Sequence, residues 1–216
     1  MAIKGIDVSY WQGQPDFTKV VAAGYEFCGI KLTDGHTIET STDHAQSVAA
    51  KAAGLKIFFY HFGHPENTDH SATDEANFFV SVIRKNSIPT ADMIPALDVE
   101  QVYAKNVEVK IPSSVSLEAW IQEFCGVLAQ NGFPKVLLYS NPTYLNEYLS
   151  VNHGLGDMPL WLSEYSSKIT LFAIGFPKVP AIWQYSGSGK VAGINGTVDL
   201  NVCDDLSPFL LNPQNT

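Results

Sequence analysis

The chain has 216 residues, of which 45% are hydrophobic, so one domain can hold all of it around a sizeable core. The formal net charge is −9, from 13 basic and 22 acidic residues, and the sequence contains no basic cluster. This balance argues against nucleic-acid binding and against docking on anionic membranes, and no apolar stretch approaches the ~20 residues that span a bilayer. We expect a monomeric single domain over residues 1–216, with no nucleic-acid partner and no membrane insertion.

Short β-rich runs alternate with longer helical patterns over the first two thirds of the chain. In chain order the pattern predicts strand 3–10, helix 15–23, strand 27–32, helix 42–53, strand 56–62, helix 70–86, strand 93–99, helix 116–131, strand 135–139 and helix 142–149. Cap residues mark several ends, such as Thr42 at the start of its helix and Gly54 just beyond it. Three further strands follow at 159–164, 180–185 and 197–202, and the Gly-rich stretch 186–196 is typical of a hairpin loop.

This order predicts an α/β fold with eight strands and about five helices. Alternating βα units imply a parallel sheet, and eight strands are enough to close a TIM-like barrel. A modified (β/α)5(β)3 barrel, whose last three crossovers lack helices, accounts for the short chain. We expect no linker, no internal repeat and no separate wall-binding module.

The three cysteines, Cys28, Cys125 and Cys203, each lie in an apolar stretch. This placement predicts buried thiols in a reducing compartment rather than a disulfide framework. The N-terminal segment MAIKGIDVSYW lacks the apolar run of a signal peptide and enters a strand at once. We therefore expect synthesis in the cytoplasm without a signal peptide.

Acidic residues fall inside apolar runs at the ends of expected strands. Asp7 lies near the end of the first strand in GIDVS, and Asp199 lies in the eighth in VDLNV. Asp98 and Glu100 close the fourth strand in ALDVE. A charge in such a run costs several kcal/mol unless it is paired, hydrated or protonated. Because the C-terminal ends of barrel strands carry catalytic groups, these positions predict an active site.

The spacing of Asp98 and Glu100 gives the pair a chemical use. Two residues apart on a strand, they share one face with Cα atoms roughly 6.5–7 Å apart. Neighbouring carboxyls split their pKa values, so one can stay protonated and donate to a leaving oxygen while the other stays charged. Glycoside hydrolysis requires this division, and its longer side chain makes Glu100 the expected acid. The alternative, a structural acid cluster that pairs with Lys31 or holds a turn, stays open.

Other polar and aromatic residues follow the same strand ends and are candidates for substrate binding in an aromatic-rimmed mouth. They are Tyr60, His61, Tyr139, Asn141, Trp161, Tyr165, Trp183 and Gln184. Each aromatic residue can equally belong to the core, and His61 alone is more typical of a hydrogen-bonded interior histidine. No HExxH, GxGxxG, P-loop or GxSxG motif occurs, so we expect no cofactor, no nucleotide and no serine nucleophile.

Taken together, these segments resemble the family 25 glycoside hydrolases, the lysozymes of the Chalaropsis type. The matching segments occur in the family's order: GIDVSYWQG at 5–13, FYHF at 59–62, ALDVE at 96–100, LLYSN at 137–141, LWLSEY at 160–165, and WQYSG followed by VDLNV at 183–202. When they occur together, the segments DVSYWQG and DVE are fairly specific to this family. The resemblance implies a barrel with five βα units and three further strands, which agrees with the pattern above.

The resemblance implies N-acetylmuramidase activity on the β-1,4 bond from N-acetylmuramic acid to N-acetylglucosamine in peptidoglycan. By position, Glu100 would be the acid/base and Asp98 its partner, while Asp7 and Asp199 would shape the charge of the site and contact substrate. Configuration would be retained, with either the substrate's N-acetyl group or a carboxylate as nucleophile; the latter needs carboxyls about 5–5.5 Å apart. We expect an endolysin that reaches the cell wall after release by a holin or by host lysis.

Two features depart from the family pattern. The segment WLSEY places Glu164 where members often carry a small residue, so Glu164 either adds a carboxylate near the mouth or faces outward. The long connection 101–115 after the fourth strand is a candidate cover for a sugar subsite.

Two other functions stay open. A metal-dependent barrel hydrolase would use Asp7, His61, Asp98 and Asp199 as ligands, and these donors suit several divalent ions. Its activity would be lost on chelation and restored by a metal. A glycan-binding protein without turnover would bind wall fragments and release no reducing ends.

Overall fold

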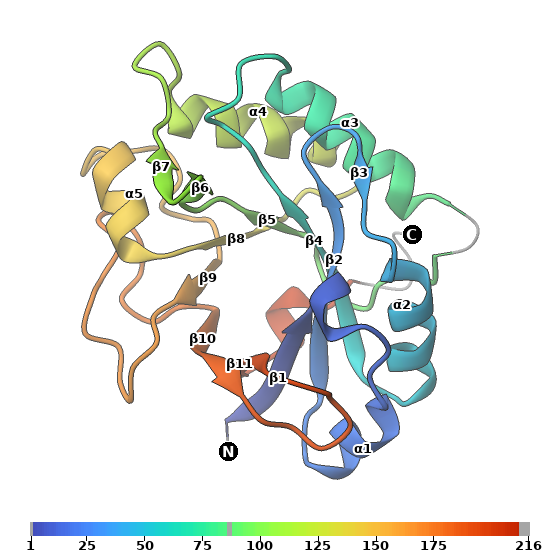
Figure 1. Cartoon of the computed structure of the whole chain (residues 1–216). Coiled ribbons are helices and arrows are strands. Elements are labelled where there is room, and N and C mark those ends of the chain that lie inside the picture. The colour runs from blue at the N-terminus through green and yellow to red at the C-terminus, as the bar shows by residue number, and fades with distance from the viewer. Residues whose placement is uncertain (1, 86–87, 212–216) are drawn as a thin grey trace.

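The computed structural model describes residues 2–85 and 88–211. Eight strands form a closed barrel in the order β1, β11, β10, β9, β8, β5, β4, β2, and β2 pairs back with β1. Their bounds are β1 (Ile3–Val8), β2 (Phe27–Asp34), β4 (Lys56–Phe62), β5 (Ala96–Asp98), β8 (Leu137–Ser140), β9 (Leu160–Ser163), β10 (Ile182–Gly189) and β11 (Val198–Cys203). Figure 1 shows the helices arranged around the outside of these strands. The predicted modified TIM-like barrel is confirmed.

Five α-helices lie in the described ranges: α1 (Phe17–Ala22), α2 (Asp43–Ala52), α3 (Ala72–Ile83), α4 (Leu117–Gln130) and α5 (Pro142–Tyr148). The side chains of Ser71, Ser116 and Asn141 accept backbone N–H groups at the starts of α3, α4 and α5. Thr42 is the N-cap of α2, as predicted, although its hydroxyl makes no capping bond. Helix α3 is shorter than the expected 70–86, and residue 86 lies outside the described residues.

Strand β11 runs antiparallel to both of its neighbours, whereas the other pairs of barrel strands are parallel. The parallel sheet expected from the alternating pattern is therefore wrong at this strand, whereas the hairpin loop expected over 186–196 agrees with the antiparallel pair of β10 and β11. A parallel neighbour needs a crossover of a dozen or more residues, and the connection 190–197 between β10 and β11 is too short. As a result, the start of β11 lies at the same rim as the C-terminal ends of the parallel strands.

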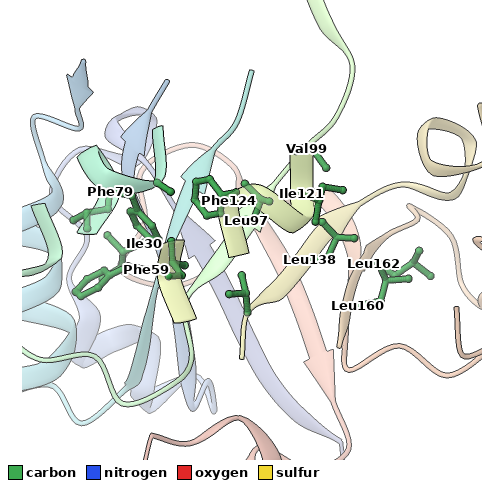
Figure 2. Close-up of a cluster of buried hydrophobic side chains, with 14 of the residues drawn as sticks. Ile30, Phe59, Phe79, Leu97, Val99, Ile121, Phe124, Leu138, Leu160 and Leu162 are labelled. Carbon is green, nitrogen blue, oxygen red and sulfur yellow. The ribbon is translucent and has the colours of Figure 1, made fainter. Parts of the chain in front are cut away.

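Apolar side chains fill two layers. In the outer layer, strand residues pack beneath helices, and Figure 2 shows Phe59 and Leu97 of the sheet close to Phe79 of α3 and Phe124 of α4. In the inner layer, side chains such as that of Trp161 fill the barrel itself. The interior is a packed core rather than a pore, so a ligand must bind at an open end.

The sequence pattern does not predict two small β elements. Strand β3 (Ile38–Glu39) pairs with the end of β2, and β6 (Val102–Ala104) forms a separate hairpin with β7 (Val107–Val109). The hairpin lies within the long connection after β5. Lys105 and Asn106 adopt positive φ at its tip, as a two-residue hairpin turn of this kind requires. These strands are too short to give a periodic signal.

The three cysteines are free thiols, as predicted. Cys28 and Cys203 are buried, while Cys125 is only half-buried. Within the described ranges, no helix combines the length and the apolar character that crossing a membrane would take.

Candidate active site

The acidic residues singled out in the sequence lie at one end of the barrel. Asp7 is near the end of β1, and its Cα partner across the ladder is Asp199, the second residue of β11. Asp98 ends β5, and Glu100 follows it two residues later. The antiparallel direction of β11 is what brings Asp199 to this rim, because it lies near the start of its strand.

Asp98 and Glu100 project from the same side of the chain into the barrel mouth. Val99 between them is fully buried in the outer core, and its N–H donates to the carbonyl of Tyr139 at 3.1 Å. Because side chains alternate along extended backbone, the two carboxyls face the opposite way from Val99. Asp98 is only 5% exposed, whereas Glu100 is half-buried and more accessible.

Burial raises the pKa of every acid in the cluster. It raises the pKa of Glu100 to about 7 and that of Asp199 to about 6. Burial and the neighbouring Asp199 raise the pKa of Asp7 to about 8. Burial and then the charge of Glu100 raise the pKa of Asp98 well above its ordinary value. Protonated carboxyls are therefore available near neutral pH. Without substrate, however, these pKa values do not make Asp98 the ionised member of its pair with Glu100.

Lys31 of β2 supplies a positive charge that opposes these shifts. It lowers the pKa of Asp98 and of Glu100. Its ammonium group bonds to Asp34 at 2.6 Å and lies 4.3 Å from the centre of the Phe62 ring. Lys31 therefore acts on the two acids through space, and its ion pair is with Asp34. A lysine inside the buried run FCGIKL is the signal that could have identified it.

Hydrogen bonds fix Asp7 beneath the mouth. Asn201 and Gln184 donate to its Oδ2 at 2.7 Å and 2.9 Å. The Oε1 of Gln184 in turn accepts the hydroxyl of Tyr139 at 2.9 Å. Sequence reasoning missed Asn201, although the alternation in VDLNV places it on the same face as Asp199.

A model of the glycosyl hydrolases family 25 matches residues 6–194, a range that includes Asp7, Asp98 and Glu100 and stops short of Asp199. The chain belongs to this family. It is 36% identical over 203 residues to the autolytic lysozyme of Clostridium acetobutylicum, over 92% of this chain and 55% of that protein. It is 28% identical over 200 residues to lysozyme M1 of Streptomyces globisporus, over 92% of this chain and 67% of that protein.

A solved bacterial lysozyme from Streptomyces coelicolor superposes on the chain with a TM-score of 0.82 at 27% identity. The superposition covers 96% of this chain and 94% of that one. The chain thus matches nearly the whole length of this structure but spans only about half the length of the Clostridium protein. These comparisons establish the family 25 barrel.

In this family 25 barrel, five of the predicted substrate-binding residues lie near the acids. Tyr60 and Tyr139 are buried and face inward. Burial raises the pKa of both hydroxyls, and the charges of Asp7, Asp98 and Glu100 raise it further. Gln184 joins them in this floor. Tyr165 is exposed at the rim and donates to Gln184 at 3.1 Å. Asn141 caps α5 and donates to Gln101 at 2.7 Å.

Trp161 and Trp183 do not reach the mouth. Trp161 is 1% exposed inside the barrel, where its indole N–H donates to Asn201 at 2.7 Å and its ring packs edge-on against Tyr139. Trp183 pairs in register with Leu162 of the outer core and donates to the carbonyl of Glu164 at 2.9 Å. One ring plugs the barrel and the other covers its outside, so neither is available as a sugar platform.

His61 lies on the outer face of β4, away from the acids. Its ring nitrogens bond to Thr33 at 2.8 Å and to Glu75 of α3 at 2.6 Å, and its ring stacks 5.0 Å from Phe124. It is fully buried, and burial lowers its pKa. His61 therefore cannot share an ion with Asp98. Across 2–85 and 88–211, no group of three or more His, Cys, Asp or Glu side chains could hold a metal ion.

Of the two departures from the family pattern, Glu164 has a structural explanation. Its carboxylate accepts the backbone N–H groups of Thr170 and Leu171 at 2.9 Å and 3.2 Å, which lowers its pKa. It therefore holds the loop after β9 instead of adding a charge to the site. The hairpin of β6 and β7 exposes Tyr103 and Val107, and its role as a cover for a sugar subsite stays a prediction.

Proposed function

We propose that this protein is a lysozyme that hydrolyses the β-1,4 bond from N-acetylmuramic acid to N-acetylglucosamine in bacterial peptidoglycan. The observation that carries the proposal is the Asp98 and Glu100 pair on one face of the chain, at the open end of a family 25 barrel. The two curated relatives described above are both named lysozymes. A pKa of about 7 lets Glu100 hold a proton at neutral pH, as a general acid must.

In the first step Glu100 donates its proton to the glycosidic oxygen while the bond from that oxygen to C1 of N-acetylmuramic acid breaks. The carbonyl oxygen of the substrate's own N-acetyl group closes on C1 and forms an oxazolinium ion. In the second step the Glu100 carboxylate takes a proton from water as that water attacks C1. The bond from C1 to the N-acetyl oxygen breaks at the same time, which restores the N-acetyl group. The configuration at C1 is retained, and Glu100 regains its proton.

Asp98 is suited to stabilise the intermediate. It lies deeper than Glu100, and its Oδ1 is buried without a hydrogen-bond partner among the described residues. An unpaired buried acceptor of this kind suits a donor that arrives with the substrate, such as the N-acetyl N–H. Positive charge developing on the sugar favours the carboxylate form of Asp98. Asp199, with a pKa of about 6, adds negative charge to the same site at neutral pH, whereas Asp7, with a pKa of about 8, is mostly protonated there.

Replacing the proposed acid tests this assignment. We expect Glu100→Gln to lower the rate of wall lysis by at least about 100-fold, because the amide cannot donate a carboxyl proton. The melting temperature should change little, since Gln fills the same space. Glu164→Gln is the matched control, because that carboxylate holds a loop outside the site.

Full lysis by the Glu100→Gln variant would remove the assignment. A chelator should leave the wild-type rate unchanged. Loss of lysis with the chelator, followed by recovery on adding a divalent metal, would favour the metal-dependent alternative instead.

The proposed partner is the glycan strand of the wall, which the protein would reach after release from the cell that makes it. We propose that residues 1–216 form one domain and that this domain acts as a monomer. Sedimentation during turnover of soluble glycan would report a larger species if this were wrong.

A further inference from the structure

The short turn that follows β1 displays two aromatic rings to solvent. Trp11 is 75% exposed and Tyr10 is 48% exposed, and their ring centroids lie 4.4 Å apart at 34°. Trp11 is more exposed than any other large hydrophobic side chain in the described part of the chain. Large exposed aromatic side chains are costly in water and often mark binding surfaces.

Hydrogen bonds hold this turn rigidly. The N–H of Ser9 donates to Oε1 of Gln12 at 2.9 Å, and its hydroxyl accepts the N–H of Trp11 at 3.4 Å. Gln46 of α2 is fully buried and donates to the carbonyls of Ser9 and Gly13 at 2.7 Å and 2.9 Å. A side chain displayed from such a fixed backbone loses less entropy when it binds a ligand.

Two links place the turn at the rim of the acidic site. Trp11 follows Asp7 by four residues, which limits their Cα separation to roughly 14 Å. On the other side, the amide of Gln12 donates to the carbonyl of Thr197 at 3.2 Å, two residues before Asp199. The rings therefore border the mouth beside β1 and β11, next to the proposed cleavage site.

We propose that Tyr10 and Trp11 form a stacking platform for a pyranose ring of the same glycan strand, outside the bond that is cut. This inference rests on the proposed function. The flat face of an indole packs against the CH face of a sugar without needing charge. That property suits a protein with a net charge of −9, which gains no long-range attraction toward an anionic polymer.

The test compares Trp11→Ala with the wild-type enzyme on soluble, uncross-linked glycan strands. We expect KM to rise at least about fivefold while kcat changes little, because the platform binds a sugar remote from the reacting atoms. Trp11→Tyr should recover most of the loss. Phe172→Ala is the matched control, since Phe172 is an exposed aromatic residue in a loop bound to Asn146 of α5. Melting temperatures should agree, because the Trp11 ring is exposed.

Calorimetry separates this inference from the proposed function. The same strands should bind a Glu100→Gln variant more tightly than a variant carrying both Glu100→Gln and Trp11→Ala. If the wild-type protein cleaves the strands while Trp11→Ala matches it in KM and in binding, only the platform is overturned. If the wild-type protein cleaves nothing, the proposed function fails, and calorimetry still decides whether Trp11 contacts glycan.

Discussion

At the residue scale, the proton on Glu100 depends on opposing influences. Burial and the charge of Asp199 raise its pKa, while the ammonium group of Lys31 lowers it. Lys31 does not pair with the acids, because Asp34 holds it at 2.6 Å. The result is a pKa of about 7, a value at which the same group can give up a proton and later take one back. Without Lys31 the pKa of Glu100 would be higher, so its carboxylate would form less readily for the second step.

The pH dependence of kcat/KM should report this balance. Glu100 must be protonated to act as an acid, so kcat/KM should fall as the pH rises through about 7. Removing a nearby positive charge disfavours the carboxylate, so Lys31→Met should move this fall to higher pH. Lys19→Met, in the exposed helix α1, should leave the profile in place. A fall that stays at the same pH in Lys31→Met would show that Lys31 does not set the pKa of the acid.

At the scale of elements, the direction of each strand and the face of each side chain decide which residues reach the site. Strand β11 contributes Asp199 because it runs opposite to its neighbours. Strand β4 directs Tyr60 inward and His61 outward, where α3 supplies Glu75 as a partner. His61 thus anchors α3 to the sheet, and it is not part of the site.

Removing Glu75 should test this structural role. The side chain is fully buried and accepts hydrogen bonds from His61 and His70, so Glu75→Ala would leave the Nε2 atom of each ring without a partner. We expect a loss of about 3–5 kcal/mol in the free energy of unfolding, measured by urea denaturation. Glu147→Ala removes a surface ion pair with Lys110 and should cost less than about 1 kcal/mol.

Activity measured below the unfolding transition separates stability from chemistry in these variants. Glu75→Ala should keep a kcat close to that of the wild-type protein, because its side chain lies on the outer face of the sheet. A large loss of kcat in a folded Glu75→Ala protein would mean that the cluster around His61 takes part in the reaction.

At the scale of the whole molecule, periodicity and turn signals predict the order of the elements and the eight barrel strands. They also predict the pairing of Asp98 and Glu100 on one face, since alternation is a local property of a strand. They do not predict which aromatic rings face the mouth. Trp161 and Tyr165 look alike in LWLSEY, yet one plugs the barrel and the other is exposed at its rim. Register between distant strands decides such differences, and a single sequence does not display register.

The direction of β11 could be predicted only in part. The alternating pattern of the first two thirds of the chain suggests that every strand is parallel, but β10 and β11 are joined without a helix. The hairpin signal of the Gly-rich stretch 186–196 favours an antiparallel pair there, and the short connection 190–197 agrees with it. The predicted strand 3–10 includes Tyr10, whereas β1 ends at Val8 and Tyr10 and Trp11 lie in a short helical turn that the sequence pattern does not predict.

The most direct test of the account is mass analysis of the fragments released from purified peptidoglycan, after reduction of their new ends. The wild-type protein should release glycan fragments that end in reducing N-acetylmuramic acid, and the Glu100→Gln variant should release almost none. Fragments ending in reducing N-acetylglucosamine, or free peptides without new reducing ends, would contradict the proposed bond and the role of the Asp98 and Glu100 pair.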